Sequence, residues 1–172
     1  FDAEKISLAL IWQGSFIDAQ MHWTGRGQGF QKPAGDAVIS LPREVLAAVL
    51  EKEDTPWPTA SAKELGYRFN GYRVDDEGRP HFQYSWKSIE FDDFPLPDST
   101  GTLPHFKRVI TIDNSKVADA NTYLRLVAGN SIEKLEDGSY RIDNALVTKI
   151  ETASPDDLFV RKVGNRQELL WR

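Results

Sequence analysis

The sequence predicts an all-β protein, an antiparallel β-sandwich with at most one or two short helices. Apolar and polar residues alternate with period two through most of the chain, as is typical of half-buried strands. Turn residues separate about ten such segments. We expect residues 1–172 to form a single sandwich domain, and the opening at Phe1, without Met or a leader, predicts that it is cut from a larger secreted protein.

The N-terminal segments show this alternation first. Residues 6–12 are predicted to form a strand, and Gln13-Gly14 offers a tight turn into residues 15–21. Residues 42–52 are different, because apolar residues recur there at helical spacing after a proline, which predicts a short helix. Residues 51–63, with two prolines around Trp57, are interpreted as a surface loop.

The clearest predicted hairpin covers residues 67–86, because the turn residues of 75–80 lie between two alternating segments. Phe82, Tyr84 and Trp86 recur at alternate positions and should share one face of the sheet. A buried face would make them core residues, whereas an exposed face would make them a platform for carbohydrate. Later alternating segments are also expected to be strands: 87–94, 106–112, 123–127, 140–142, 145–150, 158–160 and 168–171.

Composition excludes several classes of function. The net charge of −5 disfavours binding to nucleic acid, because phosphate backbones are anionic. The absence of cysteine excludes disulfides, thiolate metal sites, a cysteine nucleophile and covalently attached haem in this chain, so we expect no cofactor here. No apolar run approaches the roughly 20 residues of a membrane span. The three histidines are far apart and lack metal-ligand spacing, so no metal site is predicted.

Two pairs of adjacent carboxylates, Asp75-Asp76 and Asp92-Asp93, are interpreted as solvated turns or strand ends, where Asp is favoured by local backbone hydrogen bonds. His81 is interpreted as a strand-end histidine. None of these groups is predicted to carry chemistry.

The candidate site is the segment from residue 18 to residue 33. Between residues 19 and 35 there is no acidic residue, although the chain as a whole is acidic, and three alternate glycines allow close approach of a ligand to the backbone. The alternative is a loop that packs its two aromatic residues, Trp23 and Phe30, inward. The candidate ligand-binding residues are His22, Trp23, Arg26, Phe30 and Lys32, and the candidate catalytic residues are His22 and Asp18.

Six stretches of the sequence carry a family resemblance: Phe1–Glu4, Trp12–Ala19, His22–Gly27, Pro33–Gly35, Phe69–Phe82 and Tyr123–Gly129. Together they resemble a segment of large secreted haem-binding proteins of planctomycete-type bacteria. In that family the all-β segment accompanies a c-type cytochrome domain with a C-x-x-C-H motif, and no residue of the segment has an assigned role. The resemblance therefore implies an extracytoplasmic (periplasmic or secreted) location, with any haem c in a neighbouring domain.

Three hypotheses for function follow. The first is a non-catalytic ligand-binding or docking module of a secreted, cytochrome-associated oxidoreductase, with a glycan, another anionic or polyhydroxylated ligand, or a neighbouring domain at the 22–30 loop. The second is a carbohydrate-active enzyme of epimerase or lyase type that uses His22, Arg26 and a carboxylate such as Asp18. The third is a structural spacer.

Overall fold

The computed structural model describes residues 1–24, 31–98, 105–113 and 121–172, apart from the side chains of Met21 and His22. It confirms the all-β fold class. Among the described residues, one five-residue helix, α1 (Gln20–Thr24), and one 3-10 turn, η1 (Pro155–Asp157), accompany the strands. The strands are β1 (Leu10–Gln13), β2 (Asp36–Ser40), β3 (Ala47–Val49), β4 (Tyr67–Val74), β5 (Pro80–Trp86), β6 (Ile89–Asp98), β7 (His105–Asp113), β8 (Thr122–Gly129), β9 (Ile132–Lys134), β10 (Tyr140–Ile142), β11 (Leu146–Thr148), β12 (Leu158–Val163) and β13 (Arg166–Trp171).

The largest hairpin series forms a four-stranded antiparallel sheet in the order β4-β5-β6-β7, which we call sheet I. The predicted hairpin at 67–86 is confirmed as β4 and β5, with Tyr67 opposite Trp86. Phe82, Tyr84 and Trp86 share one face, and the last two are almost completely buried. That face is therefore the core face of sheet I.

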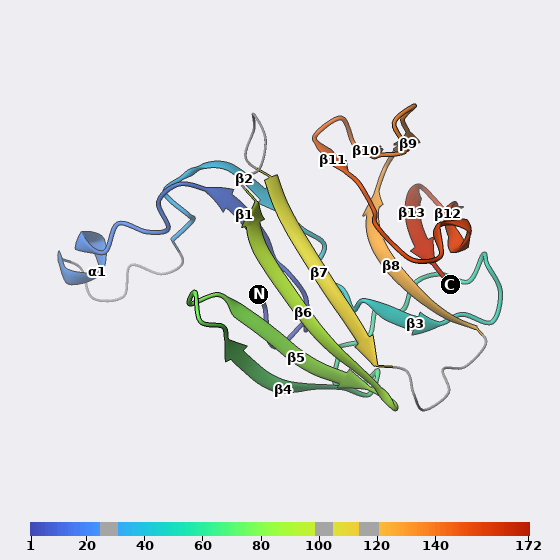
Figure 1. Cartoon of the computed structure of the whole chain (residues 1–172), viewed down its shortest axis with the longest axis horizontal. Helices are drawn as coiled ribbons and strands as arrows, with labels where there is room; N and C mark the ends of the chain where they lie inside the picture. The colour runs from blue at the N-terminus through green and yellow to red at the C-terminus, as the bar shows by residue number, and fades with distance from the viewer. Residues whose placement is uncertain (25–30, 99–104, 114–120) are drawn as a thin grey trace.

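A second four-stranded antiparallel sheet, sheet II, has the order β12-β13-β8-β3. Figure 1 shows it beside and behind sheet I, with the small sheet β11-β10-β9 at one end. The main core cluster contains residues of both sheets, among them Tyr84 and Phe91 of sheet I and Ala47 and Leu124 of sheet II. The two sheets thus bury one common set of apolar side chains, as in a sandwich.

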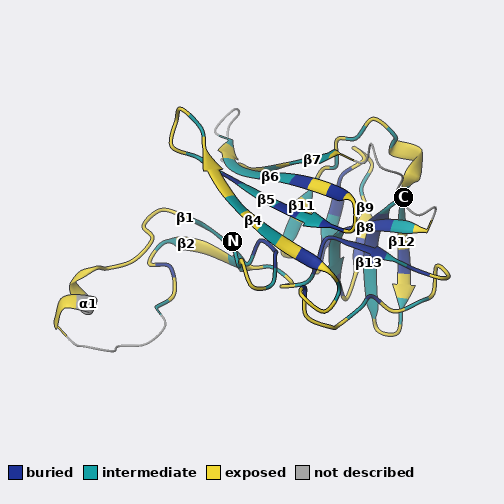
Figure 2. Ribbon diagram, turned by 90° about the horizontal axis from the view of Figure 1, so that it is seen from below, coloured by how far each residue is buried: buried dark blue, intermediate teal, exposed yellow. Residues whose placement is uncertain are grey.

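The N-terminal region departs from the two sheets as an arm, which we define as residues 9–41. β1 pairs only with β2 in the described residues, and backbone hydrogen bonds continue the ribbon from Ala9–Leu41 to Phe16–Ala34. Figure 2 shows this ribbon extending away from the body, with α1 near its far end. Gly35 permits the close pairing, because a Cβ there would collide with the carbonyl oxygen of Gln13.

The arm corrects one sequence prediction. Residues 15–21 are not a strand paired across a turn at Gln13-Gly14, because β1 instead pairs with β2, more than 20 residues later. Of the predicted strand 6–12, only residues 10–12 lie in a sheet strand, because Ile6 has a positive φ of 51° and Ser7 forms an isolated bridge with Asp2. A local turn signal does not predict this pairing, because the partner strand is distant in sequence.

The predicted helix at 42–52 is also wrong. Val45 to Ala48 are all buried, and β3 pairs with β8, with Ala47 opposite Leu124. A short, continuously apolar segment fits a buried strand as well as one helical turn, so its spacing did not decide between them. The loop 51–63 is mostly exposed as predicted, except that Trp57 and Ala62 are buried. Trp57 Nε1 donates a hydrogen bond to the Val45 carbonyl oxygen (3.2 Å).

Trp86→Ala is expected to lower the free energy of unfolding by about 3–5 kcal/mol, because it opens a cavity in the common core. It also removes the hydrogen bond from Trp86 Nε1 to the Leu65 carbonyl oxygen (2.9 Å). Urea unfolding followed by circular dichroism measures the change. The matched control is Trp23→Ala on the exposed arm, which should change stability by less than about 0.5 kcal/mol; equal effects of the two substitutions would contradict the core assignment.

Candidate functional sites

The structure places the sequence-predicted site on the arm. Trp23 is 86% exposed, so the alternative in which it packs inward is wrong. Lys32 is exposed, and the carboxylate of Asp18 accepts a hydrogen bond from the backbone N–H of Gln20 (3.0 Å), which caps the start of α1. The side chain of His22 and the whole of residues 25–30, including Arg26 and Phe30, lie outside the described residues.

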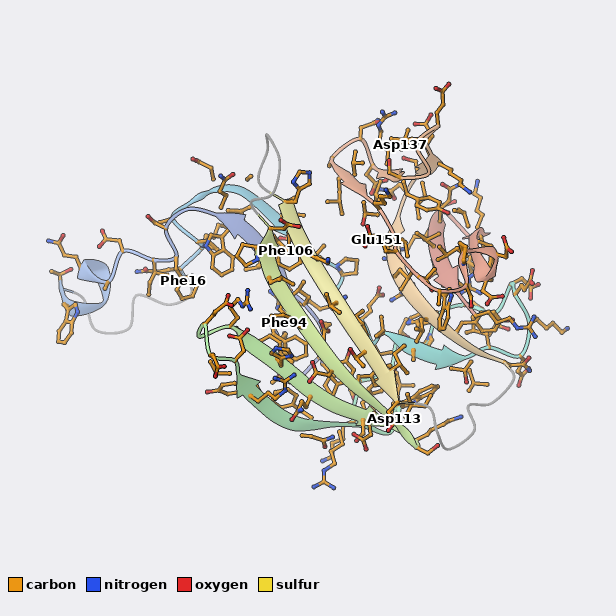
Figure 3. All side chains as sticks on the ribbon, viewed as in Figure 1. Phe16, Phe94, Phe106, Asp113, Asp137 and Glu151 are labelled. Atoms are coloured by element: carbon orange, nitrogen blue, oxygen red, sulfur yellow. The ribbon has the colours of Figure 1, made fainter. Side chains whose placement is uncertain are left out.

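The arm also carries an aromatic surface that sequence reasoning did not single out. Trp12 and Phe16 stack with ring centroids 5.1 Å apart, and Phe16 is 60% exposed. Figure 3 shows Phe16 on the arm, away from both sheets. Large apolar side chains that remain this exposed on a projecting element are typical of a surface that meets a partner.

A second group of residues, the outer-face cluster, lies on the face of sheet I that points away from the core. It joins Arg73 of β4, His81 of β5 and Asp92 of β6. His81 Nδ1 lies 2.7 Å from Asp92 Oδ1, and Arg73 Nη2 lies 3.2 Å from Asp92 Oδ2. Because an ionised carboxylate only accepts, Nδ1 must carry the proton that bonds to Asp92, and the short contact of Arg73 Nη2 with Nδ1 is then not a hydrogen bond.

Phe94 covers this cluster. Its ring stacks on the His81 imidazole with centroids 3.8 Å apart, and the guanidinium of Arg79 lies 5.2 Å from the Phe94 centroid. Figure 3 shows Phe94 near the turn between β4 and β5, where Asp75 binds Arg79. His81 lies at the start of β5, as the sequence predicted, and its side chain is buried and oriented.

The pair Asp92-Asp93 is not a solvated turn, as the sequence predicted, since both residues lie within β6. Adjacent strand residues point to opposite faces, so Asp92 faces outward and Asp93 faces the core, where it is fully buried. Arg108 of β7 binds Asp93 through both Nε (2.8 Å) and Nη2, and the Tyr84 hydroxyl donates to Asp93 (3.3 Å). Burial and the charge of Asp93 raise the pKa of Tyr84, which keeps this hydroxyl protonated.

The pair Asp75-Asp76 does lie in a turn, as predicted.

A third group, which we call the ion network, is buried in sheet II. Glu168 of β13 accepts hydrogen bonds from Arg125 Nη1 (2.8 Å) and Arg161 Nε (2.8 Å), and all three side chains are at most 6% exposed. Arg125 also pairs with Glu44, which in turn contacts Arg166 (3.2 Å). The loop 51–63 contacts the arginines of this network.

Two arginines hold that loop in place. Arg161 Nη1 donates to the backbone oxygens of Glu53 (2.5 Å) and Thr55 (2.9 Å). The guanidinium of Arg125 lies 4.5 Å from the ring centroid of Trp57. The two arginines therefore serve the packing of the loop on sheet II rather than an open site.

Two cavities lie near the base of the arm. The first is bordered by residues 6–8 and 41–46, by Arg108 and by residues 125–128, and the second by residues 43–45 and 58–62. Neither is lined by Asp18, His81 or Asp92. Neither of these two cavities therefore borders the outer-face cluster.

No metal centre is found among the described residues, where no group of three or more histidines and carboxylates could hold an ion. In the same part of the chain, no helix is long and apolar enough to cross a membrane. No protein-family model, curated protein or solved structure matches the sequence.

Glu168→Gln is expected to lower the free energy of unfolding by about 3–5 kcal/mol, because two buried guanidiniums lose the charge that balances them. Equilibrium unfolding in urea measures the loss. Glu133→Gln is the matched control, since Glu133 pairs with Arg141 (2.8 Å) on the exposed surface and should cost at most about 1 kcal/mol. Similar values for the two variants would show that the ion network does not stabilise the fold.

Asp92→Asn is expected to reduce the loss of stability in acid. Burial opposes ionisation of Asp92, but the hydrogen bond from His81 and the charge of Arg73 outweigh it and lower the pKa of the carboxyl. The stabilisation is therefore present above the ordinary Asp pKa of about 3.9 and is lost as pH falls through the lower folded pKa.

Urea unfolding at a series of pH values from about 5 to about 2 measures this dependence. The wild type should lose more stability than Asp92→Asn over that range, and Asp76→Asn in the exposed turn should behave as the wild type. Parallel curves for Asp92→Asn and the wild type would exclude the ionised contact with His81 and Arg73.

Proposed function

We propose that this chain is a non-catalytic docking module whose arm inserts aromatic side chains into a recess on a partner protein domain. The observation that carries the proposal is the exposure of Trp23 and Phe16 on an element that projects from the body. Tryptophan and other aromatic residues supply much of the binding energy at protein interfaces, because they bury a large area at a small cost in side-chain entropy.

Charge defines the chemistry of the partner. The segment 19–35 contains Arg26 and Lys32 but no carboxylate, in a chain whose net charge is −5. A recess with an apolar floor and an acidic rim fits this arm, because it complements both the aromatic and the cationic side chains. The neighbouring c-type cytochrome domain and the extracytoplasmic location are part of the proposal, and they rest on the sequence resemblance alone.

The carbohydrate-active enzyme is the second candidate, and the geometry favours it less. Its candidate carboxylate, Asp18, bonds to the backbone of α1 on an exposed ribbon, and Asp18 lines neither of the two cavities. Catalysis on a sugar needs an acid and a base positioned around a bound substrate in a recess. A glycan could still stack on Trp23 without catalysis.

Photo-crosslinking in the cells that produce the protein tests the docking proposal. Trp23 is replaced by the photoreactive residue benzoylphenylalanine, and the control carries the same replacement at Tyr72, which is 64% exposed on β4. The position-23 variant should yield one dominant protein adduct that position 72 does not, and Phe16→Ala in the same chain should weaken that adduct about tenfold or more.

Two results would contradict the proposal. One is an equal adduct pattern from positions 23 and 72, which would show that the arm has no preferred partner. The other is a saccharide adduct at position 23, which would replace protein docking by glycan binding. Thermal unfolding of each variant verifies that the body remains folded.

A further inference from the structure

We infer that the outer edge of β7 pairs with β7 of a second copy of this chain, so that two copies of sheet I join into one continuous antiparallel sheet. β7 is the last strand of sheet I and pairs only with β6 in the described residues. Figure 1 shows it in yellow at the margin of the sheet. Its nine residues make it the longest edge strand of the described sheets, and none of the nine is buried. The inference does not depend on docking by the arm.

The edge of β7 is unusually regular for a strand that ends a sheet. Its pairing with β6 runs through all nine residues without a bulge, and the strand contains neither proline nor glycine. β4, the opposite edge of the same sheet, is interrupted by a bulge between Phe69 and Gly71, and Gly71 has a φ of 120°. Bulges and prolines are features that keep edge strands from pairing with other chains. β7 is therefore the edge of sheet I that can serve as a template for another strand.

The charges of β7 favour a second β7 that runs antiparallel to the first. Lys107, near the start of the strand, makes no ion pair with a described residue. Asp113, at its end, lies opposite Glu90 of β6, so two carboxylates are adjacent on the outer face of sheet I. A lysine on an edge usually opposes pairing, but an antiparallel copy brings its Lys107 next to this acidic end. A parallel, in-register copy would instead place like charges side by side.

One register aligns the whole strand with its copy and places Val109 opposite Val109 on a two-fold axis. Phe106 then lies opposite Ile112 of the second copy on the core side of the sheet. Phe106 is 40% exposed and Ile112 is half-buried, so this pair covers apolar surface that a single chain leaves in solvent. The other pairs of this register are His105 with Asp113, Lys107 with Thr111 and Arg108 with Ile110.

A single cysteine tests both the pairing and the register, because the chain contains no other cysteine. Val109→Cys places two thiols across the two-fold axis, where cross-strand Cβ atoms are about 4.5–5.5 Å apart and a disulfide can form. Val160→Cys is the matched control, since Val160 lies on β12, an edge strand of sheet II, and is 38% exposed, against 39% for Val109. Under mild oxidation, Val109→Cys should give a disulfide-linked dimer about tenfold faster or more, because pairing raises the local thiol concentration. Equal rates for the two variants would overturn the inference.

Sedimentation velocity at protein concentrations from about 1 to about 200 µM tests the association without a covalent bond. The wild type should shift from monomer towards dimer as concentration rises. Val109→Lys should weaken this dimer about tenfold or more, because it places two like charges on the axis. Val74→Lys, at a 54% exposed position of β4, should leave the dimer unchanged, as should Trp23→Ala on the arm.

Two results of this experiment would overturn the inference. One is a wild type that stays monomeric over the whole range. The other is a dimer that survives Val109→Lys, which would assign the contact to another surface, and loss of the dimer in Trp23→Ala would assign it to the arm. Circular dichroism verifies that each variant is folded, and the cysteine experiment decides if Val109→Lys is not.

Discussion

The structure of sheet II depends on the buried carboxylate of Glu168. It balances Arg125 on one neighbouring strand and Arg161 on the other, and these arginines in turn hold Trp57 and the backbone of Glu53 and Thr55. Since buried charges are tolerated only when they are paired, the strands and the loop 51–63 must take their positions together. Glu44, which binds Arg125, extends the same constraint to the base of the arm.

Sheet I has a corresponding constraint in the pair Asp93–Arg108, which connects β6 and β7 from within the core. Ile6, before the arm, and Val45 and Leu46, after it, pack into the common core. Both ends of the arm are therefore anchored. The ribbon between them pairs only with itself in the described residues and leaves Phe16 and Trp23 in solvent. A fixed base with an exposed aromatic end is the arrangement that a docking element requires.

The sequence predicted the strands of sheet I because they alternate cleanly, but it could not predict partners that are distant along the chain. The sequence predicted a helix over residues 42–52 because β3 and the residues before it are continuously apolar and buried, so they do not alternate as a half-buried strand does. Side chains alternate along β6, so Asp93 shares a face with Phe91, and its burial could have been predicted from the sequence. Its pairing with Arg108 could not, because it depends on the register between β6 and β7. At the candidate site, charge identified the arm, but the exposure of Trp23 depends on tertiary contacts that no local pattern contains.

Native-state hydrogen exchange measures most directly whether a cooperative body carries an independently opening arm. Core amides of β5 and β6 in sheet I and of β8 and β13 in sheet II should exchange with one common free energy, equal to that of global unfolding. Amides of β1 and β2 should exchange at a much lower free energy, because an isolated two-stranded ribbon is only marginally stable. Separate opening energies for the two sheets, or arm amides as protected as those of the core, would contradict this description of the protein.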